Sequence, residues 1–173
     1  MTDAELLMAA GVYREIRRHL VRERPRAEEA AFAYLDRADS NHRFELVRWE
    51  PVPQSGFIYQ SLYGLELTDE YRAKVIKQAH DLGSALMELH SHPLSKYAAF
   101  SPSDQAGFLE FVPHVRWRLK GKPYFAVVFS AREFDSLWWL SDSAMPDGAV
   151  RLRVEGRTVE PSRVTLEEWE KYA

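Results

Sequence analysis

The feature that most constrains this chain is an apolar run that ends in two histidines and a proline. Residues 84–90 are apolar enough to form a buried strand, and Ser91, His92 and Pro93 follow directly. Side chains two residues apart along a strand point to the same side of a sheet, so His90 and His92 are expected to project together. Pro93 takes the chain out of the strand. The histidines therefore belong at its carboxyl end, where the ligand sites of α/β proteins usually lie.

Helix and strand patterns alternate along the rest of the chain. Apolar residues at helical spacing predict helices over 12–22, 69–82 and 102–119. Apolar or alternating runs predict strands over 30–35, 44–49, 84–90, 124–129 and 150–154, and another within 57–67, while 5–8 fits either a strand or a helix start. The turn residues at 39–41 predict a hairpin between the first two of these strands. A second hairpin is expected around the turn at 155–157, extending through Val159 and Val164.

This order of elements predicts a single domain over residues 1–173, because the chain shows no repeat, linker or low-complexity segment. Strands that alternate with helices, together with hairpins, favour the α/β class, with a mixed β-sheet flanked by helices. Trp138 and Trp139 fit a core wedge better than a protein-binding surface. Trp117 is expected on the helix over 102–119, where it can rim a groove.

Charge and cysteine content exclude several classes of protein. The net charge is −3, and the basic residues of 14–26 are interleaved with glutamate, so nucleic acid is not an expected partner. The chain has no cysteine, which excludes disulfides, restricts metal ligands to His, Asp and Glu, and suits a reducing cytoplasm. Residues 1–5 lack the basic start of a signal peptide, and no apolar run approaches the ~20 residues of a membrane span. We therefore expect a cytoplasmic protein without a membrane partner.

Two histidines held on one side of a strand are a natural start for a metal site. A catalytic zinc takes three protein ligands and leaves one position open for water, and Asp104, in the first turn of the next helix, can supply the third. The same segment also fits a plain helix start, with Ser101 as N-cap, Pro102 at the first helical position and Asp104 near the positive helix end. The pattern alone leaves both interpretations open.

The order of these residues resembles the JAMM motif of the MPN/JAB metallopeptidases. That motif is a glutamate early in the chain, then His-x-His-Pro, then Ser-x-x-Asp. Here His90-Ser91-His92-Pro93 and Ser101-Pro102-Ser103-Asp104 match its last two parts. The likeness covers roughly residues 5–130, including the order of the flanking elements. One departure is that the stretch from His92 to Asp104 is one residue longer than the commonest family spacing, which an insertion in the intervening loop would absorb.

The resemblance implies an MPN/JAB fold, which is cytidine-deaminase-like, and a role for each motif residue. It implies that His90, His92 and Asp104 bind zinc, with water as the fourth ligand. It also implies that Ser101 donates a hydrogen bond to the oxyanion that develops on the substrate. The loops over 51–56 and 93–100 are expected to flank the site.

The family places its general base at the start of an early strand. Glu28 is the best match here, because two small residues follow it in the corresponding places, and Glu29 is the alternative. Without the motif, Glu28 would be better interpreted as a surface charge. Glu88 shares the side of the strand that carries the histidines but lies two residues further back, so we expect it to be a supporting or structural residue.

Members of this family cleave isopeptide or peptide bonds after the C-terminal glycine of ubiquitin-like proteins. A compact chain of this kind resembles the bacterial type, which accompanies ubiquitin-like, E1-like and E2-like proteins and matures or deconjugates the modifier, in some cases in antiphage defence. Two alternatives remain open: a relative that acts on sulfur-carrier proteins or short peptides, and a non-catalytic MPN scaffold. A DNA-repair-associated JAB protein fits less well, because Leu94 follows Pro93 where that type has a His-x-His-Pro-Ser-Gly loop.

Overall fold

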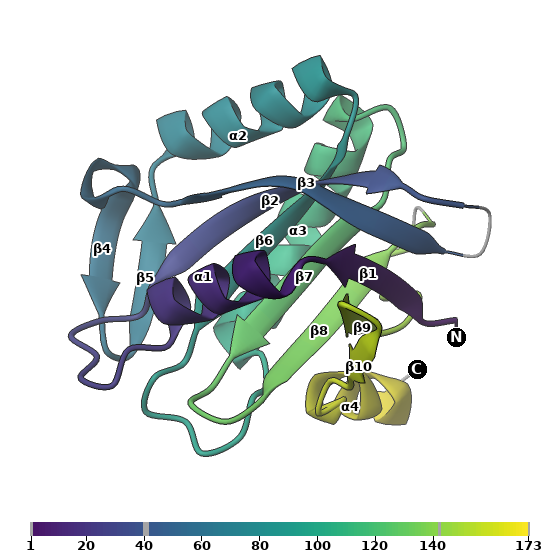
Figure 1. Cartoon of the computed structure of the whole chain (residues 1–173). Coiled ribbons are helices and arrows are strands. Elements are labelled where there is room, and N and C mark those ends of the chain that lie inside the picture. The colour runs from purple at the N-terminus through teal and green to yellow at the C-terminus, as the bar shows by residue number, and fades with distance from the viewer. Residues whose placement is uncertain (1, 40–41, 142, 173) are drawn as a thin grey trace.

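An eight-stranded mixed sheet is the frame of the molecule (Figure 1). This computed structural model describes residues 2–39, 42–141 and 143–172. The strands of the sheet are β1 (Ala4–Met8), β2 (Ala30–Arg37), β3 (Arg43–Pro51), β6 (Ala85–Ser91), β7 (Tyr124–Phe129), β8 (Phe134–Trp139), β9 (Val150–Val154) and β10 (Arg157–Val159). A separate two-stranded sheet consists of β4 (Phe57–Ser61) and β5 (Gly64–Leu67). The helices are α1 (Ala10–Leu20), α2 (Asp69–Leu82), α3 (Pro102–Arg118) and α4 (Val164–Tyr172), and a 3-10 turn covers Gln54–Gly56.

The strands follow the order β10-β9-β1-β3-β2-β6-β7-β8 across the large sheet. β1 is parallel to both β3 and β9, β6 is parallel to β7, and the other neighbours are antiparallel. The sheet curls so that its end strand β8 reaches β9, the second strand from the other end. There the Ser136 hydroxyl on β8 donates to the Val150 carbonyl on β9 at 3.0 Å and accepts from the Val150 N–H at 2.9 Å. β6, which carries His90, is thus enclosed between β2 and β7.

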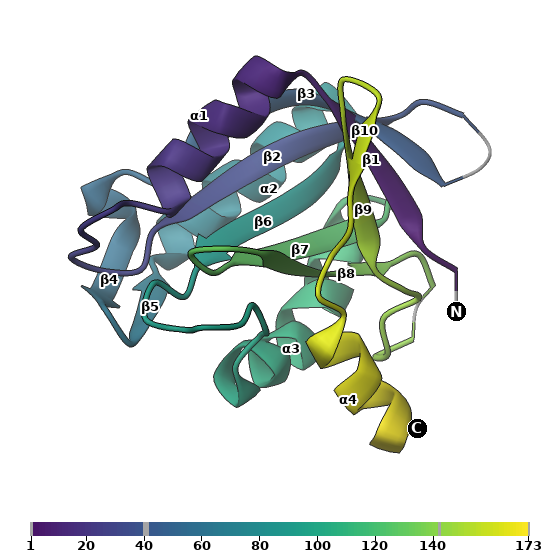
Figure 2. The ribbon, with the colours of Figure 1, turned by 60° about the horizontal axis from the view of Figure 1, so that its bottom comes forward.

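Each face of the sheet is covered and has its own core. On one face, α2 and α3 pack over β2, β6 and β7, and the buried side chains include Phe32 and Trp139. On the other face, Ile16 and Leu20 of α1 belong to a second cluster that contains Trp138. Figure 2 shows α1 and α3 on opposite sides of the sheet. The two tryptophans are neighbours on a strand and so face opposite ways, and their prediction as core residues is confirmed.

Local signals explain where α2 begins and ends. The Thr68 hydroxyl accepts a hydrogen bond from the Tyr71 N–H at 3.1 Å, which satisfies one of the free donors of the first turn. The helix ends at Gly83, whose φ of 68° is the left-handed conformation that glycine adopts without a Cβ penalty. Of the predicted apolar face, Tyr71, Val75 and Ala79 are buried, whereas Leu82 in the last turn is 47% exposed.

The predicted α/β class and mixed sheet flanked by helices are confirmed, and the predicted bounds of β7 and β9 are correct. Residues 5–8 form part of the strand β1, and β2 and β3 pair as the predicted hairpin. The turn predicted at 39–41 falls partly on residues 40 and 41, which lie outside the described residues. None of the helices in the described parts of the chain is both long enough and apolar enough to cross a bilayer.

Two predicted elements differ in extent from the structure, and the prediction for Val164 was wrong. The helix predicted over 12–22 starts at Ala10 and ends at Leu20. The segment 57–67 contains two strands joined by a tight turn, rather than one. Val164 begins α4 instead of extending a hairpin. The Asp135 carboxylate accepts hydrogen bonds from the N–H groups of Arg163 and Thr165, at 3.1 and 2.9 Å, and so fixes the chain in a helix start.

Candidate metal centre

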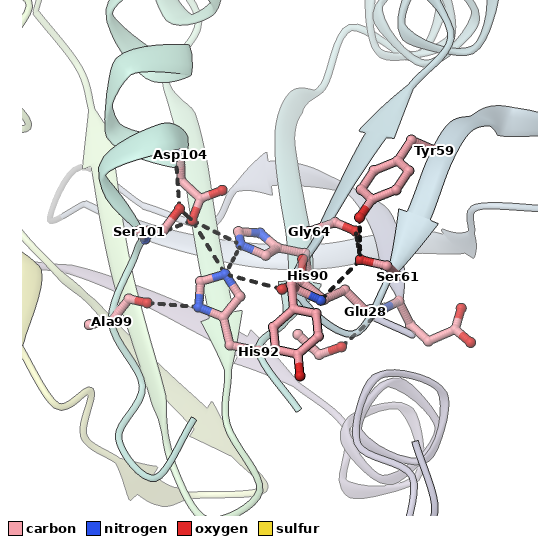
Figure 3. Close-up of polar contacts among 12 residues, drawn as sticks. Glu28, Tyr59, Ser61, Gly64, His90, His92, Ala99, Ser101 and Asp104 are labelled. Atoms are coloured by element: carbon pink, nitrogen blue, oxygen red, sulfur yellow. Dashed lines mark hydrogen bonds and ion pairs between the residues drawn. The ribbon is translucent and has the colours of Figure 1, made fainter. Parts of the chain in front are cut away.

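His90, His92 and Asp104 converge at the carboxyl end of β6 (Figure 3). The Nε2 atoms of the two histidines are 3.2 Å apart, and they lie 3.5 and 3.3 Å from one oxygen (Oδ2) of Asp104. One ligand atom from each residue can be chosen so that all three lie within 4.8 Å of one another. The two histidines therefore project together as predicted, and the first turn of α3 brings the aspartate to them. The set can hold a metal ion.

The backbone fixes which nitrogen of His92 faces the cluster. Its Nδ1 atom lies 3.0 Å from the Ala99 carbonyl oxygen, and a carbonyl only accepts hydrogen bonds. Nδ1 therefore carries the proton in the neutral ring, whose Nε2 lone pair points at Asp104 and His90 and is free to bind a metal. The charged ring instead donates from Nε2 to Asp104. A ring held in this way by a hydrogen bond on its other nitrogen is the usual arrangement of a metal-binding histidine.

Asp104 is held by the cap of α3. The Ser101 hydroxyl accepts from the Asp104 N–H at 3.2 Å, while the Asp104 Oδ2 atom accepts from the Ser101 N–H and from the Ser101 hydroxyl, both at 2.7 Å. This reciprocal pair is a capping box, followed by Pro102 at the first helical position. The helix-start interpretation and the metal interpretation of this segment are therefore compatible, because the cap orients the same carboxylate that faces the histidines.

The charges of the cluster favour a cation. Burial alone would raise the pKa of Asp104, but hydrogen bonds from His90, His92 and Ser101 outweigh it and hold that pKa far below its usual range. Burial would lower the pKa of His90, yet the hydrogen bond to Asp104 and the charges of Asp104, Glu88 and Glu28 raise it. The site thus keeps Asp104 ionised and stabilises positive charge on the neighbouring ring, and a metal ion would benefit from the same field.

The carboxylate of Glu28 lies beside this cluster, whereas that of Glu29 does not. The Glu28 Oε1 atom is 4.0 Å from His92 Nε2, and its residue is only 6% exposed. Glu29 instead forms an ion pair with Arg22 at 3.2 Å and accepts from the Gln60 side chain at 3.3 Å. Of the two glutamates that the sequence left open, the structure brings Glu28 to the histidines.

The environment of Glu28 moves its acidity in the direction that proton transfer requires. Burial raises the pKa of Glu28, and the nearby charges of His92 and His90 oppose this shift without cancelling it. Its main chain is fixed from β4, since its N–H donates to the Ser61 carbonyl at 2.7 Å and its carbonyl accepts from Gln60 at 2.8 Å. A buried carboxyl whose pKa is shifted towards neutral pH is suited to take up and return a proton.

The loop between the histidines and α3 is held in place by hydrogen bonds at its far end. The Ala98 N–H donates to Glu133 at 3.0 Å, and the Phe100 N–H donates to the Thr165 hydroxyl at 2.9 Å. The loop closes over the site side of β6, where its Ala99 carbonyl reaches His92. The length of this loop therefore does not separate the three candidate ligands.

The other singled-out residues lie as follows. The Ser101 hydroxyl donates to Asp104, so the geometry shows it supporting that carboxylate, and its predicted role towards an oxyanion stays a prediction. Glu88 accepts a hydrogen bond from the Tyr124 hydroxyl and is not one of the three grouped ligands. Burial raises the pKa of Glu88.

Trp117 does not rim this site. It is 72% exposed near the far end of α3 and lines another hollow, with Lys120.

Sequence reasoning missed the contribution of β4 to the site. The loop over 51–56 was predicted to flank it, but the contacts to Glu28 come from Gln60 and Ser61 on the strand that follows. It also missed Ala99, which acts through a carbonyl and so carries no signal in its side chain.

No protein-family model matches this sequence, and no curated protein is significantly similar to it.

Proposed function

We propose that this protein is a zinc-dependent peptidase of the JAMM type, with an MPN/JAB fold, that cleaves after the C-terminal glycine of a ubiquitin-like protein. The observation that carries the proposal is the convergence of His90, His92 and Asp104, with the buried carboxylate of Glu28 4.0 Å from His92. Two imidazoles, one carboxylate and a nearby acid that is not needed as a ligand are the parts of a hydrolytic zinc site.

The chemistry of the donor set supports zinc as the metal. Zinc binds imidazole and carboxylate ligands, and catalytic sites use three protein ligands. When bound, it supplies a Lewis acid that polarises a carbonyl group and lowers the pKa of a coordinated water. His90, His92 and Asp104 would hold it, and Ser101 and the Ala99 carbonyl orient two of these ligands.

The residues around the ligands have separable tasks. Glu28 accepts a proton from the attacking water and returns it to the leaving amine, a task that its raised pKa favours. Ser101 keeps the Asp104 carboxylate in place with its one hydroxyl hydrogen. The oxyanion role of the family pattern would require this hydrogen to turn from Asp104 to the substrate. His92 keeps its ring orientation through Ala99 while the proton moves.

The two-stranded sheet beside Glu28 supports an extended peptide as the substrate. β4 and β5 pair with each other, and Ser61 at the end of β4 contacts the Glu28 N–H. An extended chain can add to a strand edge through backbone hydrogen bonds, which is how a flexible C-terminal tail is often bound. We propose a ubiquitin-like tail as this chain, with E1-like and E2-like proteins as further partners.

Metal analysis and cleavage test the proposal. The purified protein is expected to carry about one zinc per chain, and Asp104→Ala should remove most of it, because the site loses its only carboxylate ligand. Asp69→Ala is the matched control, since Asp69 also lies in the first turn of a helix but away from the cluster. A ubiquitin-like protein with a reporter fused after its terminal glycine is then incubated with the zinc-loaded protein.

Two outcomes would reject the proposal. A folded protein that takes up no zinc, or one that loses as much zinc with Asp69→Ala as with Asp104→Ala, contradicts the metal site. Stoichiometric zinc without cleavage of any glycine-tailed fusion would leave a metal-binding scaffold and exclude the peptidase.

A further inference from the structure

A cavity of about 320 Å³ opens next to the candidate metal centre, with His90 and Asp104 in its wall. It lies between α3 and β5, the second strand of the two-stranded sheet, over the face of β2 and β6. Its wall is about equally polar and apolar, and the apolar part includes five large side chains, Phe32, Leu65, Leu67, Phe108 and Phe111. A cavity of this kind beside a reaction centre is suited to one side chain of a bound peptide.

The cavity is lined by more acidic than basic side chains. Glu66, Glu88 and Asp104 line it, and Arg72 is the cation among the described lining residues. The Arg72 guanidinium lies over the Phe111 ring, 5.0 Å from its centroid. A zinc ion at the neighbouring centre would be balanced by Asp104 and Glu28, which leaves Glu66 and Glu88 against Arg72 in the cavity itself. This excess of one acid favours a positively charged guest.

Glu88 is the acid on the sheet face of the cavity, and the charges of His90 and Arg72 act on its carboxylate. It accepts a hydrogen bond from Tyr124, and within residues 2–39, 42–141 and 143–172 no lysine or arginine forms an ion pair with it. It precedes His90 by two residues on one face of β6, a rise of about 6.6 Å along a strand. This is close to the length of an extended lysine side chain, so a residue beside the reaction centre can reach it.

We propose that this cavity is a specificity pocket for a lysine or arginine side chain next to the scissile bond, with the cationic head on Glu88 and the aliphatic stem against the phenylalanines. The inference rests on the peptidase function proposed above. An apolar guest would leave the Glu88 carboxylate desolvated with one hydrogen bond, and an acidic guest would be repelled. The acylated lysine of an isopeptide has lost its charge, so the pocket selects a neighbouring basic residue instead.

Binding to a non-cleaving form tests the pocket. Zinc-loaded Glu28→Gln protein is titrated with two acetylated tetrapeptide amides, Gly-Gly-Lys-Gly and the same peptide with norleucine, which keeps the stem without the charge. Calorimetry is expected to show the lysine peptide binding roughly tenfold more tightly. Adding Glu88→Gln should abolish this difference, because its amide can still accept from Tyr124 but carries no charge. Adding Glu66→Gln, an exposed acid of the same cavity, should retain most of it.

A second variant keeps the test decisive if Glu88→Gln fails to fold. Arg72→Gln removes the competing cation and should increase the preference for lysine. Equal binding of the two peptides to the protein with Glu88 intact, or a lysine preference that survives Glu88→Gln, overturns the inference. If the protein binds zinc and cleaves a glycine-tailed fusion yet shows no lysine preference, the pocket inference alone fails. If it takes up no zinc and cleaves nothing, the proposed function fails.

Discussion

Asp104 shows how one residue can serve both folding and chemistry. Its Oδ2 atom accepts two hydrogen bonds from Ser101 at 2.7 Å and faces two histidine nitrogens at 3.3 and 3.5 Å. From sequence, the Ser-Pro-x-Asp segment supported either a helix cap or a metal ligand, and these appeared as alternatives. In the structure they are compatible, because the cap sets the position of the candidate ligand.

Glu28 and Glu29 offer a test with neighbouring residues of the same kind. Glu28→Gln is expected to lower kcat for peptide cleavage by at least about 100-fold, because the side chain loses its capacity to accept a proton. The zinc content should remain unchanged. Glu29→Gln breaks an ion pair with the exposed Arg22, away from the histidines, and should leave kcat within about twofold. Steady-state kinetics and metal analysis measure both, and similar losses in the two variants would contradict the assignment.

Ser101 has a structural task that can be separated from the site with a second helix cap. Ser101→Ala should lower the free energy of unfolding by about 1 kcal/mol through loss of the cap, and weaken zinc binding about 10- to 100-fold through loss of the hydroxyl on Asp104. Thr68→Ala removes the cap of α2 and should cost similar stability without changing zinc affinity. Equal zinc affinities in the two variants would show that the Ser101 hydroxyl does not support the metal ligand.

At the scale of elements, what could be predicted from the sequence was local. α2 was found because a cap, an apolar face and a terminal glycine all lie within 16 residues, 68–83, and β7 because it is a continuous apolar run. The break between β4 and β5 was missed because Ser61 and Gly64 enclose a short turn without a strong turn sequence at Leu62 and Tyr63.

The three candidate ligands could be predicted because they too form a local pattern: two come from one strand and the third from the next helix. Glu28 needed the resemblance, because it lies far from the histidines in sequence and only the pairing of β2 with β6 brings them together. The pocket around Glu88 was not predicted, because its wall combines β2, β5, β6, α2 and α3. No local pattern encodes such a combination.

The glycines of two helices provide opposite expectations for one substitution. Gly83→Ala should lower the free energy of unfolding by about 1 kcal/mol, because φ is +68° there and a Cβ is disfavoured. Gly107 lies inside α3, and a Cβ added there would meet no neighbouring atom within 4 Å. Gly107→Ala should therefore raise the free energy of unfolding by up to about 1 kcal/mol. Urea denaturation measures both, and the same sign for both changes would contradict this account.

At the scale of the molecule, each face of the sheet has its own core, and successive residues of β8 belong to one core and then the other. Trp139 belongs to the core under α2 and α3, next to the site, and Trp138 to the core under α1. The Trp138 ring stacks on Phe125 with centroids 5.9 Å apart, and its N–H donates to the Thr2 carbonyl at 2.9 Å. The core under α1 therefore connects the start of the chain to the sheet.

This arrangement predicts that Trp138→Ala will lower the free energy of unfolding by about 3–5 kcal/mol, the range expected for a large buried aromatic side chain. The surface control is Trp117→Ala, where 72% exposure predicts a change below about 0.5 kcal/mol. Chemical denaturation followed by circular dichroism compares them. A small effect of Trp138→Ala would mean that the core under α1 contributes little to the stability of the whole molecule.

The position of β1 has a consequence for synthesis on the ribosome. β1 lies between β3 and β9, so one of its edges is completed by residues 150–154. At translation rates of about 5–20 residues per second, that partner emerges roughly 7–30 s after β1. During this interval a nascent chain exposes an unpaired strand edge, which is a template for pairing with other chains. Chaperone occupancy on nascent chains should therefore be highest before β9 leaves the exit tunnel and fall once it has paired.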